Sequence, residues 1–434
     1  MTTTRKKHKP SIHGKIIDKR DGWITIHIFG EPRERGFAHG QLLKNQLKRV
    51  VKVLSFIVKE YLECDFSEYM KTSNRLIKPI VKKRFPEFYE ELVGIAQGSS
   101  ISVDFLIAWN ALLTLSDVIN KGSNKLGRCS AFIATGNATE KGDMIMGHNT
   151  HSDFATGSLS NIVMYITPTS GKPFCMQTSP GLISSATDWF VSTSGIMGCE
   201  TTISDINYTP VLGSPCFCRI RQAIQYGNTM NDYVEIMTKD NAGDYPCSWL
   251  LGDIKTNEIM LLEQGLTVIA VKRKHKGVFY GMNSAISDEL REKETTDSSI
   301  SDIRTSSGSR NYRLNYLLNK KYDGKISIKI AKEVMGDHYD SYLNKNALNS
   351  RGICKHVELD GEPENKKPYY PFGCTDTKIM DTEMASKLCF MGRMGCCCGK
   401  PFSVKPYIEK HPEYKHWKNV LEDMPKERWC KICM

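Results

Sequence analysis

The sequence predicts an α+β protein in which two sheets pack face to face between layers of helices. Residues 21–128 are mostly helical in pattern, and the pattern changes at Cys129. From there to residue 283, short apolar or alternating runs are separated by Gly, Asn, Asp and Pro, which is typical of antiparallel hairpins. Helical spacing returns after this region. Helices on both sides of a strand-rich region allow each sheet to bury one face against the other sheet and one against helices.

The N-terminal part is expected to contain a tail, a strand and three helices. Residues 1–20 are polar and basic, which indicates a flexible tail. Residues 23–30 alternate like a half-buried strand, and residues 31–40 are expected to form a turn punctuated by glycine. Helical spacing follows at 41–62, 86–100 and 102–119, with Pro86 near the start of the second helix and Ser102 or Asp104 as the cap of the third.

The remaining elements are predicted from the same two patterns, which are alternation for strands and helical spacing for helices. Strands are expected at 129–135, 143–149, 161–168, 173–179, 189–203, 248–265, 267–274 and 277–283. A helix at 216–240 interrupts them and is expected to hinge at Gly227, and two more helices are expected at 311–321 and 328–340. From residue 350 the sequence is rich in Gly, Pro, Cys and Lys, which indicates irregular structure.

Composition narrows the class of protein. Of the 434 residues, 40% are hydrophobic and 25% charged, which is ordinary for a soluble globular protein. An apolar run of about 18 residues, as a membrane-spanning helix needs, does not occur, and the basic start lacks the apolar stretch of a secretory signal. The expected location is therefore the cytoplasm. The net charge of +11 lies in separate runs without interleaved aromatic residues, so we expect no nucleic-acid binding and only weak contact with anionic membrane surfaces. The oligomeric state stays open.

Fifteen cysteines in a long chain without an export signal are expected to be reduced. Four of them have no neighbouring residues that suggest a chemical role and are expected to be structural: Cys64, Cys175, Cys247 and Cys389. "MGCCCGK" at 394–400 and the terminal "CKIC" leave a zinc or redox site as an alternative, although three adjacent cysteines cannot all reach one tetrahedral ion. We expect no metal and no other cofactor.

Cys129 has neighbours that suit a nucleophile. It opens the first expected strand of its region, and a nucleophilic thiol needs a base and donors for an oxyanion nearby. "GHNTHSD" at 147–153 follows about 20 residues later, the length of a strand, a turn and the next strand. Alternation along that strand places His148 on one face and three side chains on the other: Asn149, His151 and Asp153. From these residues alone, Cys129 remains a nucleophile, a metal ligand or a packed core thiol.

Seven segments occur in the order of a known family over most of residues 22–400. They are "GEPRERGFAHGQLL" (30–43), "PEFYEELVGIAQG" (86–98), "CSAF" (129–132), "GHNT" (147–150), and the segments 179–203, 240–259 and 373–381. Each is weak alone, but together they resemble the N-terminal-nucleophile (Ntn) hydrolases of the acyl-coenzyme A:6-aminopenicillanic acid acyltransferase group (peptidase family C45), and especially their phospholipase B-like relatives.

The resemblance implies a four-layer αββα sandwich in which the helical segment 21–128 and a core at 129–400 form one fold, followed by a Cys- and Lys-rich tail at 401–434. It also implies that the chain cuts its own backbone between Arg128 and Cys129. The new α-amine, with a reference pKa of roughly 7.7–8.0, would then act as the general base for the thiol. Arg128 stands where the acyltransferases carry Gly.

By position, the resemblance implies that His148 and Asn149 orient the amine or bind substrate, and that Asn283 stabilises the oxyanion. A hairpin-turn role for Asn283 stays open as the alternative. Residues expected to support the site or the substrate are His151, Asp153, Glu200, Thr201, Asn241 and Asp376. His151 stands where the relatives carry Trp or Asp.

The expected function is that of an Ntn amidohydrolase or acyltransferase with a cysteine nucleophile, acting on acylated small molecules or lipids. Two alternatives remain. One is a phospholipase B-like hydrolase of lipid esters, and the other is a catalytically silent member that serves as a binding or structural protein.

Overall fold

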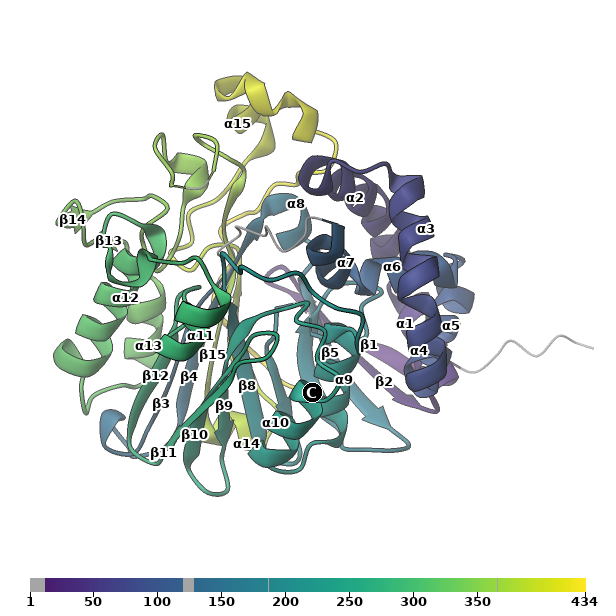
Figure 1. Ribbon diagram of the computed structural model, residues 1–434, viewed down its shortest axis with the longest axis horizontal. Helices are drawn as coiled ribbons and strands as arrows, with labels where there is room; N and C mark the ends of the chain where they lie inside the picture. The colour runs from purple at the N-terminus through teal and green to yellow at the C-terminus, as the bar shows by residue number, and fades with distance from the viewer. Residues whose placement is uncertain (1–11, 120–128, 186, 365) are drawn as a thin grey trace, which may run out of the picture.

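A computed structural model describes residues 12–119, 129–185, 187–364 and 366–434. In this part of the chain, two large sheets lie between two layers of helices (Figure 1). The predicted four-layer αββα class is therefore confirmed. No helix among the described residues is both long and apolar enough to cross a membrane.

The larger sheet has nine strands in the described part of the chain. In spatial order they are β1 (Gly14–Arg20), β2 (Trp23–Gly30), β5 (Ile162–Pro168), β6 (Phe174–Thr178), β7 (Phe190–Ser192), β8 (Ile196–Thr202), β9 (Cys247–Asp253), β10 (Glu258–Gln264) and β11 (Ile269–Lys274). The pair β2–β5 is parallel, and the other pairs of this sheet are antiparallel.

The smaller sheet carries the start of the core. In spatial order its strands are β12 (Gly277–Gly281), β3 (Cys129–Thr135), β4 (Ile145–Asp153), β15 (Phe372–Asp381), β16 (Phe390–Met394) and β17 (Cys430–Ile432). A separate two-stranded hairpin joins β13 (Tyr339–Asp340) to β14 (Lys345–Asn346). Cys129 pairs with Thr150 across β3 and β4, so the hairpin expected from the spacing is confirmed.

Three apolar cores hold the layers together. The core between the sheets takes side chains such as Ala131 and Met146 from the smaller sheet and Leu250 and Leu261 from the larger. The outer face of the larger sheet packs on α1 (Pro32–Leu42), α9 (Cys216–Tyr226) and α10 (Met230–Thr238). The outer face of the smaller sheet packs on α12 (Ser306–Tyr316) and α13 (Ile328–Met335). Both faces of each sheet are thus covered by apolar side chains, as a layered fold requires.

The N-terminal helices form a fourth core beside the sheets, seen at the right of Figure 1. They are α2 (Lys44–Leu62), α3 (Phe66–Leu76), α4 (Lys78–Arg84), α5 (Pro86–Ser99), α6 (Val103–Asn110) and α7 (Leu112–Ile119). Of the two predicted cap residues, Ser102 caps α6, since its Oγ accepts the Phe105 N–H at 3.2 Å. The helix expected at 102–119 is interrupted at Ala111, and the predicted hinge at Gly227 separates α9 from α10.

The remaining helices are short and lie in connections. They are α8 (Phe154–Gly157), α11 (Asp288–Glu294), α14 (Thr382–Ser386) and α15 (Val404–Lys410), together with a π-helical turn at Leu317–Lys321 that extends α12.

The expected turn at residues 31–40 is wrong, because this segment forms α1. Pro32 occupies its first turn, and Glu31 and Glu34 form a reciprocal capping box. Its glycines serve packing rather than a turn: a Cβ on Gly36 would lie 2.1 Å from the Glu91 carbonyl oxygen of α5. A Cβ on Gly98 of α5 would lie 2.3 Å from the Phe37 carbonyl oxygen. The two glycine-containing motifs of the N-terminal half therefore form one tight helix pair.

Two fully buried arginines and a carboxylate connect this helix pair to α9. Arg35 Nε donates to Glu91 Oε2 at 2.6 Å, and Arg221 Nη2 donates to the same oxygen at 2.9 Å. Arg35 also donates to Glu87 at 2.7 Å. All three side chains are 0% exposed: Arg35, Glu91 and Arg221. Their charged groups therefore interact with one another instead of with water.

Three expectations about the ends of the chain are corrected. Residues 14–20, placed in the flexible tail, form the edge strand β1, whose exposed polar side chains hide the strand period. Residues 373–381, within the stretch from residue 350 that was expected to be irregular, belong to the buried strand β15, which has polar residues because they bond to one another inside the sheet. The C-terminal segment 401–434 is not a tail, since Trp417 is fully buried in the helical core and β17 joins the smaller sheet.

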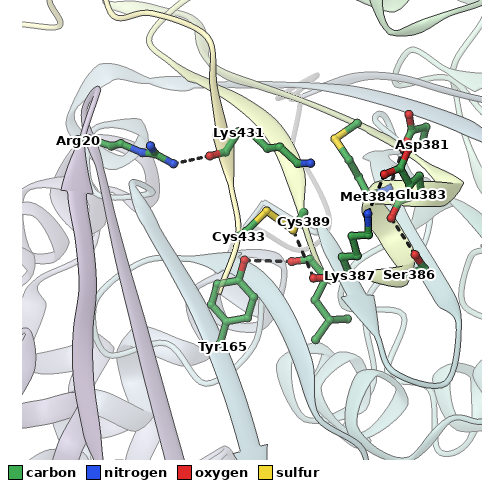
Figure 2. Close-up of a disulfide and its surroundings, with 11 residues drawn as sticks. Arg20, Tyr165, Asp381, Glu383, Met384, Ser386, Lys387, Cys389, Lys431 and Cys433 are labelled. Atoms are coloured by element: carbon green, nitrogen blue, oxygen red, sulfur yellow. Dashed lines mark hydrogen bonds and ion pairs between the residues drawn. A yellow bond between two sulfur atoms is a disulfide. The ribbon is translucent and has the colours of Figure 1, made fainter.

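The expectation that the cysteines are reduced is wrong at one pair. Cys389 and Cys433 form a disulfide with an S–S distance of 2.13 Å (Figure 2). Beside it, the Tyr165 hydroxyl donates to the Leu388 carbonyl at 3.0 Å, and Arg20 of β1 donates to the Lys431 carbonyl. The bond ties β17 to the segment before β16, so Cys433 is not available as a zinc ligand.

A buried histidine in α1 makes stability depend on pH. His39 Nε2 accepts the Gly181 N–H at 2.9 Å, and burial lowers the pKa of this fully buried imidazole to about 4. Below the unfolded pKa of about 6.5, the unfolded chain therefore binds a proton that the folded chain refuses, and stability falls as the pH falls. This single group removes about 2 kcal/mol between pH 7 and pH 5.

The variant His39→Gln tests this prediction, because the glutamine oxygen can accept the Gly181 N–H without titrating. Denaturant unfolding at pH 7 and pH 5 should show a smaller loss of stability in the variant than in the wild type, by about 2 kcal/mol. Equal losses in the two proteins would contradict the assignment.

Candidate active site

A cavity of about 310 Å³ lies between the N-terminal helices, α9 and the open end of the sheets. Polar residues from the strands form one part of its wall: Cys129, Thr150, His151, Asp153, Glu200 and Tyr245. Apolar side chains from the helices and a loop form another part: Ile57, Leu62, Trp109, Leu182, Phe217 and Ile220. A concave, mostly apolar space with a few convergent polar groups is typical of a small-molecule site.

Cys129 is the first residue of β3 and lines this cavity. Its side chain is 3% exposed, and its Sγ lies 3.9 Å from Glu200 Oε1 of β8 in the opposite sheet. Burial, and then the negative charge of Glu200, raise the pKa of the thiol, while Lys378 opposes them. In the intact chain the thiol is therefore protonated at neutral pH, and any nucleophilic use of it needs a base.

Arg310 of α12 connects Cys129 to Asn283, although no sequence signal indicated it. Its Nη1 donates to the Cys129 carbonyl at 2.7 Å and to Ser130 Oγ at 3.1 Å, and its Nη2 donates to Asn283 Oδ1 at 2.9 Å. Burial lowers the pKa of this fully buried guanidinium to about 10, so it stays charged at neutral pH. Arg310 thus fixes the backbone at the start of β3.

The geometry does not favour an oxyanion role for Asn283. Its Nδ2 already donates to the Thr202 carbonyl at 2.9 Å, its Oδ1 accepts from Arg310, and it does not line the cavity. The alternative of a turn residue fits better, since Asn283 has a φ of 83° just after β12.

The structure confirms the two faces expected along β4. His148 Nε2 lies 3.0 Å from the Glu200 carbonyl between the sheets. Asn149 points the other way, where its Nδ2 donates to the carbonyls of Met335 at 2.8 Å and Ile353 at 3.0 Å. His151 Nε2 lies 3.1 Å from that same Ile353 carbonyl, although His151 also lines the cavity.

Neither imidazole is arranged as a base for the thiol. Burial, with the positive charges of Lys378 near His148 and of Lys355 near His151, lowers the pKa of both rings well below the ordinary value. Both rings therefore stay neutral, and both bond to backbone carbonyls. The backbone amide of His151, rather than its ring, favours the thiolate form of Cys129.

Two carboxyl groups share a tyrosine beside the thiol. The Tyr245 hydroxyl lies 2.7 Å from Asp188 Oδ2 and 2.7 Å from Glu200 Oε1. One hydroxyl proton cannot serve both contacts, so one carboxyl must itself carry a proton. Burial and the neighbouring Glu200 raise the pKa of Asp188 well above its usual range. Sequence reasoning found Glu200 but missed Asp188 and Tyr245.

A buried lysine completes the polar centre. Lys378 of β15 forms an ion pair with Asp376, and its Nζ donates to Thr150 Oγ1 at 2.7 Å. Lys378 and Asp376 are both 0% exposed. Asp376 therefore supports Thr150, the cross-strand partner of Cys129, and does not itself line the cavity.

The other predicted residues divide into two groups. Asp153 lines the cavity and caps α8 by accepting the Thr156 N–H at 2.8 Å. Thr201 is buried against Gly281, and Asn241 donates to the carbonyls of Gly265 and Leu266, so neither side chain lines the cavity. Arg128, on the other side of the expected cleavage bond, lies outside the described residues.

Fold and site together define a four-layer αββα protein in which a cysteine opens a central strand at an internal cavity. A phospholipase B family model matches residues 92–270. The chain is 24% identical over 303 residues to Phospholipase-B 81 of Drysdalia coronoides, which covers 64% of this chain and 53% of that protein. It is 21% identical over 224 residues to the 40 kDa form of acyl-coenzyme A:6-aminopenicillanic-acid-acyltransferase of Emericella nidulans, covering 50% and 57%.

These matches confirm the resemblance predicted from the motifs: the chain is similar to phospholipase B and to the acyltransferase. It spans about half the length of the curated relatives it matches. Among solved structures, a mutant of conjugated bile acid hydrolase from Clostridium perfringens aligns with a TM-score of 0.36 and 10% identity, covering 61% of this chain and 89% of that one.

Proposed function

We propose that this protein is an Ntn-type hydrolase or acyltransferase that cuts its own backbone before Cys129 and then uses that residue on an acylated small molecule or lipid. The observation that carries the proposal is the position of Cys129 as the first residue of β3, with its side chain at the cavity wall. A cut at this point frees an α-amine within the same residue as the thiol, so no separate base is needed.

The chemistry follows from that juxtaposition. The free amine of Cys129 takes the thiol proton, and the thiolate attacks the acyl carbonyl to form a tetrahedral intermediate. The ammonium returns the proton to the leaving amine as the carbon–nitrogen bond breaks, which leaves a thioester on Sγ. Water or a second amine then attacks the thioester and releases the acyl group.

Three features of the site support these steps. The raised pKa keeps the thiol mostly protonated, and the amine freed by cleavage supplies a base for its later attack on the substrate. The backbone amide of His151 favours the thiolate form of Cys129, and we assign no oxyanion role to Asn283, whose amide already donates to the Thr202 carbonyl. Arg310 holds the Cys129 carbonyl, which positions the residue after its N-terminal bond is cut.

The cavity favours an acyl chain as the bound part of the substrate. Its apolar side chains come from α2, α6 and α9, and its volume of about 310 Å³ lies at the lower end of small-molecule pockets. Apolar burial would hold the chain, and the polar wall at Cys129 would receive the carbonyl. Because the family model that matches residues 92–270 is that of phospholipase B, cleavage of a lipid ester is the second candidate.

Intact mass of the purified protein tests self-cleavage. Division of the 49.1 kDa chain in proportion to the residues on each side of the bond predicts fragments of about 14 and about 35 kDa. The fragments should copurify, because the segments on both sides of the bond share the cores of one fold.

A substrate panel then identifies the reaction. N-acyl amino acids, ceramide-like amides and lysophospholipids should be compared, with release of the acyl group as the readout. Hydrolysis of amides supports the first candidate, and hydrolysis confined to lysophospholipids supports the second. An uncut chain that cleaves none of the three classes would refute both and leave a binding or structural role.

A further inference from the structure

Two cysteines and two histidines converge in a second cluster, which the proposed reaction does not use. Their potential ligand atoms all lie within 4.8 Å of one another: His338, Cys354, His356 and Cys398. His338 lies between α13 and β13, the pair Cys354 and His356 precedes β15, and Cys398 follows β16. The cluster therefore joins three segments that are far apart in the sequence.

The distances suit a tetrahedral ion. His356 Nε2 lies 3.5 Å from Cys398 Sγ and 3.7 Å from Cys354 Sγ. For zinc, bonds of about 2.3 Å to sulfur and about 2.0–2.1 Å to nitrogen place neighbouring nitrogen and sulfur ligands about 3.5 Å apart. The protein atoms thus already lie near the edges of such a tetrahedron.

The surroundings orient the ligands as metal sites usually do. His356 Nδ1 lies 2.7 Å from Glu358 Oε1, a contact that directs Nε2 of the same ring toward the two sulfurs. His338 Nε2 is buried and has no hydrogen-bond partner within the described ranges. Such an atom is costly to bury unless it has a ligand of its own.

We propose that His338, Cys354, His356 and Cys398 form a structural zinc site. Two thiolates and two neutral imidazoles fill all four tetrahedral positions, which is the pattern of structural rather than catalytic zinc. Binding releases the thiol protons of Cys354 and Cys398 to solvent, and no oxidant or reductant takes part. This set differs from the C-terminal zinc alternative, because only Cys398 of the three adjacent cysteines belongs to it, and Cys433 is in a disulfide.

The neighbouring thiols have other partners. Cys397 Sγ lies 3.9 Å from the Lys332 carbonyl, away from the cluster. Cys396 Sγ accepts the Lys400 N–H at 3.0 Å and lies 3.2 Å from Cys398 Sγ, so it serves as a neighbour of the site. These contacts explain how one of three adjacent cysteines is selected as a ligand.

The ion would stabilise the support of the active-site strand. The Ile353 carbonyl, adjacent to Cys354, accepts the Asn149 amide and contacts the His151 ring of β4. Cys374 N–H of β15 donates to the Lys355 carbonyl at 2.9 Å, between the two proposed ligands Cys354 and His356. A fixed position of residues 353–356 therefore fixes the outer side of β4.

Metal analysis of the full-length protein tests the site. Protein purified under reducing conditions with zinc and then dialysed should retain one zinc per chain. Cys354→Ser and Cys398→Ser should lose it, and the adjacent Cys397→Ser is the matched control that should keep it. Glu358→Gln should weaken zinc binding about 10–100-fold, because it removes the charge that orients His356.

Two further measurements keep the test decisive if a cysteine variant fails to fold. Wild-type protein reconstituted with Co²⁺ should show the sulfur-to-cobalt charge-transfer band and the visible bands of a tetrahedral site. A strong chelator should lower the Tm of the wild type, and added zinc should restore it. Any of three results would overturn the proposal. They are less than one zinc per folded wild-type chain, zinc retained in Cys398→Ser, and a disulfide among Cys354, Cys396 and Cys398.

Discussion

Cys129→Ala is expected to yield a single uncut chain of 49.1 kDa that releases no acyl group from any substrate of the wild type. The substitution removes both the thiol that attacks the preceding carbonyl and the nucleophile of the later reaction. Loss of a nucleophile lowers turnover by a factor on the order of 10³ or more. Intact mass and acyl release measured on the same preparation check both effects.

Cys216→Ala is the matched control for this prediction. Cys216 also lines the cavity and is equally buried, but its Sγ contacts Thr114 Oγ1 at 3.7 Å and lies outside the centre around Cys129. The variant should be cut and active. Cys129→Ser keeps a weaker nucleophile and should be cut slowly or not at all. Full activity in folded Cys129→Ala would rule out the proposed mechanism.

Glu91→Ala is expected to destabilise the protein by about 3–5 kcal/mol, since it leaves two arginines buried without their shared carboxylate. Although burial alone raises it, Arg221 and Arg35 lower the pKa of Glu91 below its ordinary value. The carboxylate therefore adds stability above its unfolded pKa and loses that contribution as the pH falls through the folded pKa. Denaturant unfolding at neutral pH gives the size of the effect, and the gap between wild type and variant should narrow in acid.

Glu90→Ala is the matched control, because it changes the adjacent residue of the same helix. The Glu90 side chain is 46% exposed, and its carboxylate lies 3.7 Å from Arg33, whose side chain is 54% exposed. An exposed pair of this kind contributes about 0–1 kcal/mol. Similar losses in Glu90→Ala and Glu91→Ala would show that the buried network does not stabilise the fold as described.

Local sequence patterns gave correct predictions where a segment has its own helical spacing, strand alternation, cap or hinge residue. Apolar spacing predicted α2 and α5, the cap at Ser102 and the hinge at Gly227 were correct, and alternation along β4 separated His148 from Asn149. These features depend on residues close in the chain, so the sequence is sufficient to find them.

The predictions failed where the structural role of a residue depends on a partner far away in the sequence. The glycines at 31–40 suggested a turn because the tight contact with α5 is made by residues more than 50 positions away. The strand β15 was missed because it lies in a stretch rich in Gly, Pro, Cys and Lys, and because its Lys378 and Asp376 neutralise each other only inside the sheet.

By itself, the sequence determined the fold class, the relation to phospholipase B and the acyltransferase, and Cys129 as the residue that opens the central strand. Only the tertiary structure decided what surrounds that thiol. Arg310, Asp188 and Lys378 come from three separate segments and are informative only when burial brings their charges together. The same holds for the proposed zinc ligands, because the direction of each side chain depends on how its segment packs, and spacing along the chain does not encode that direction.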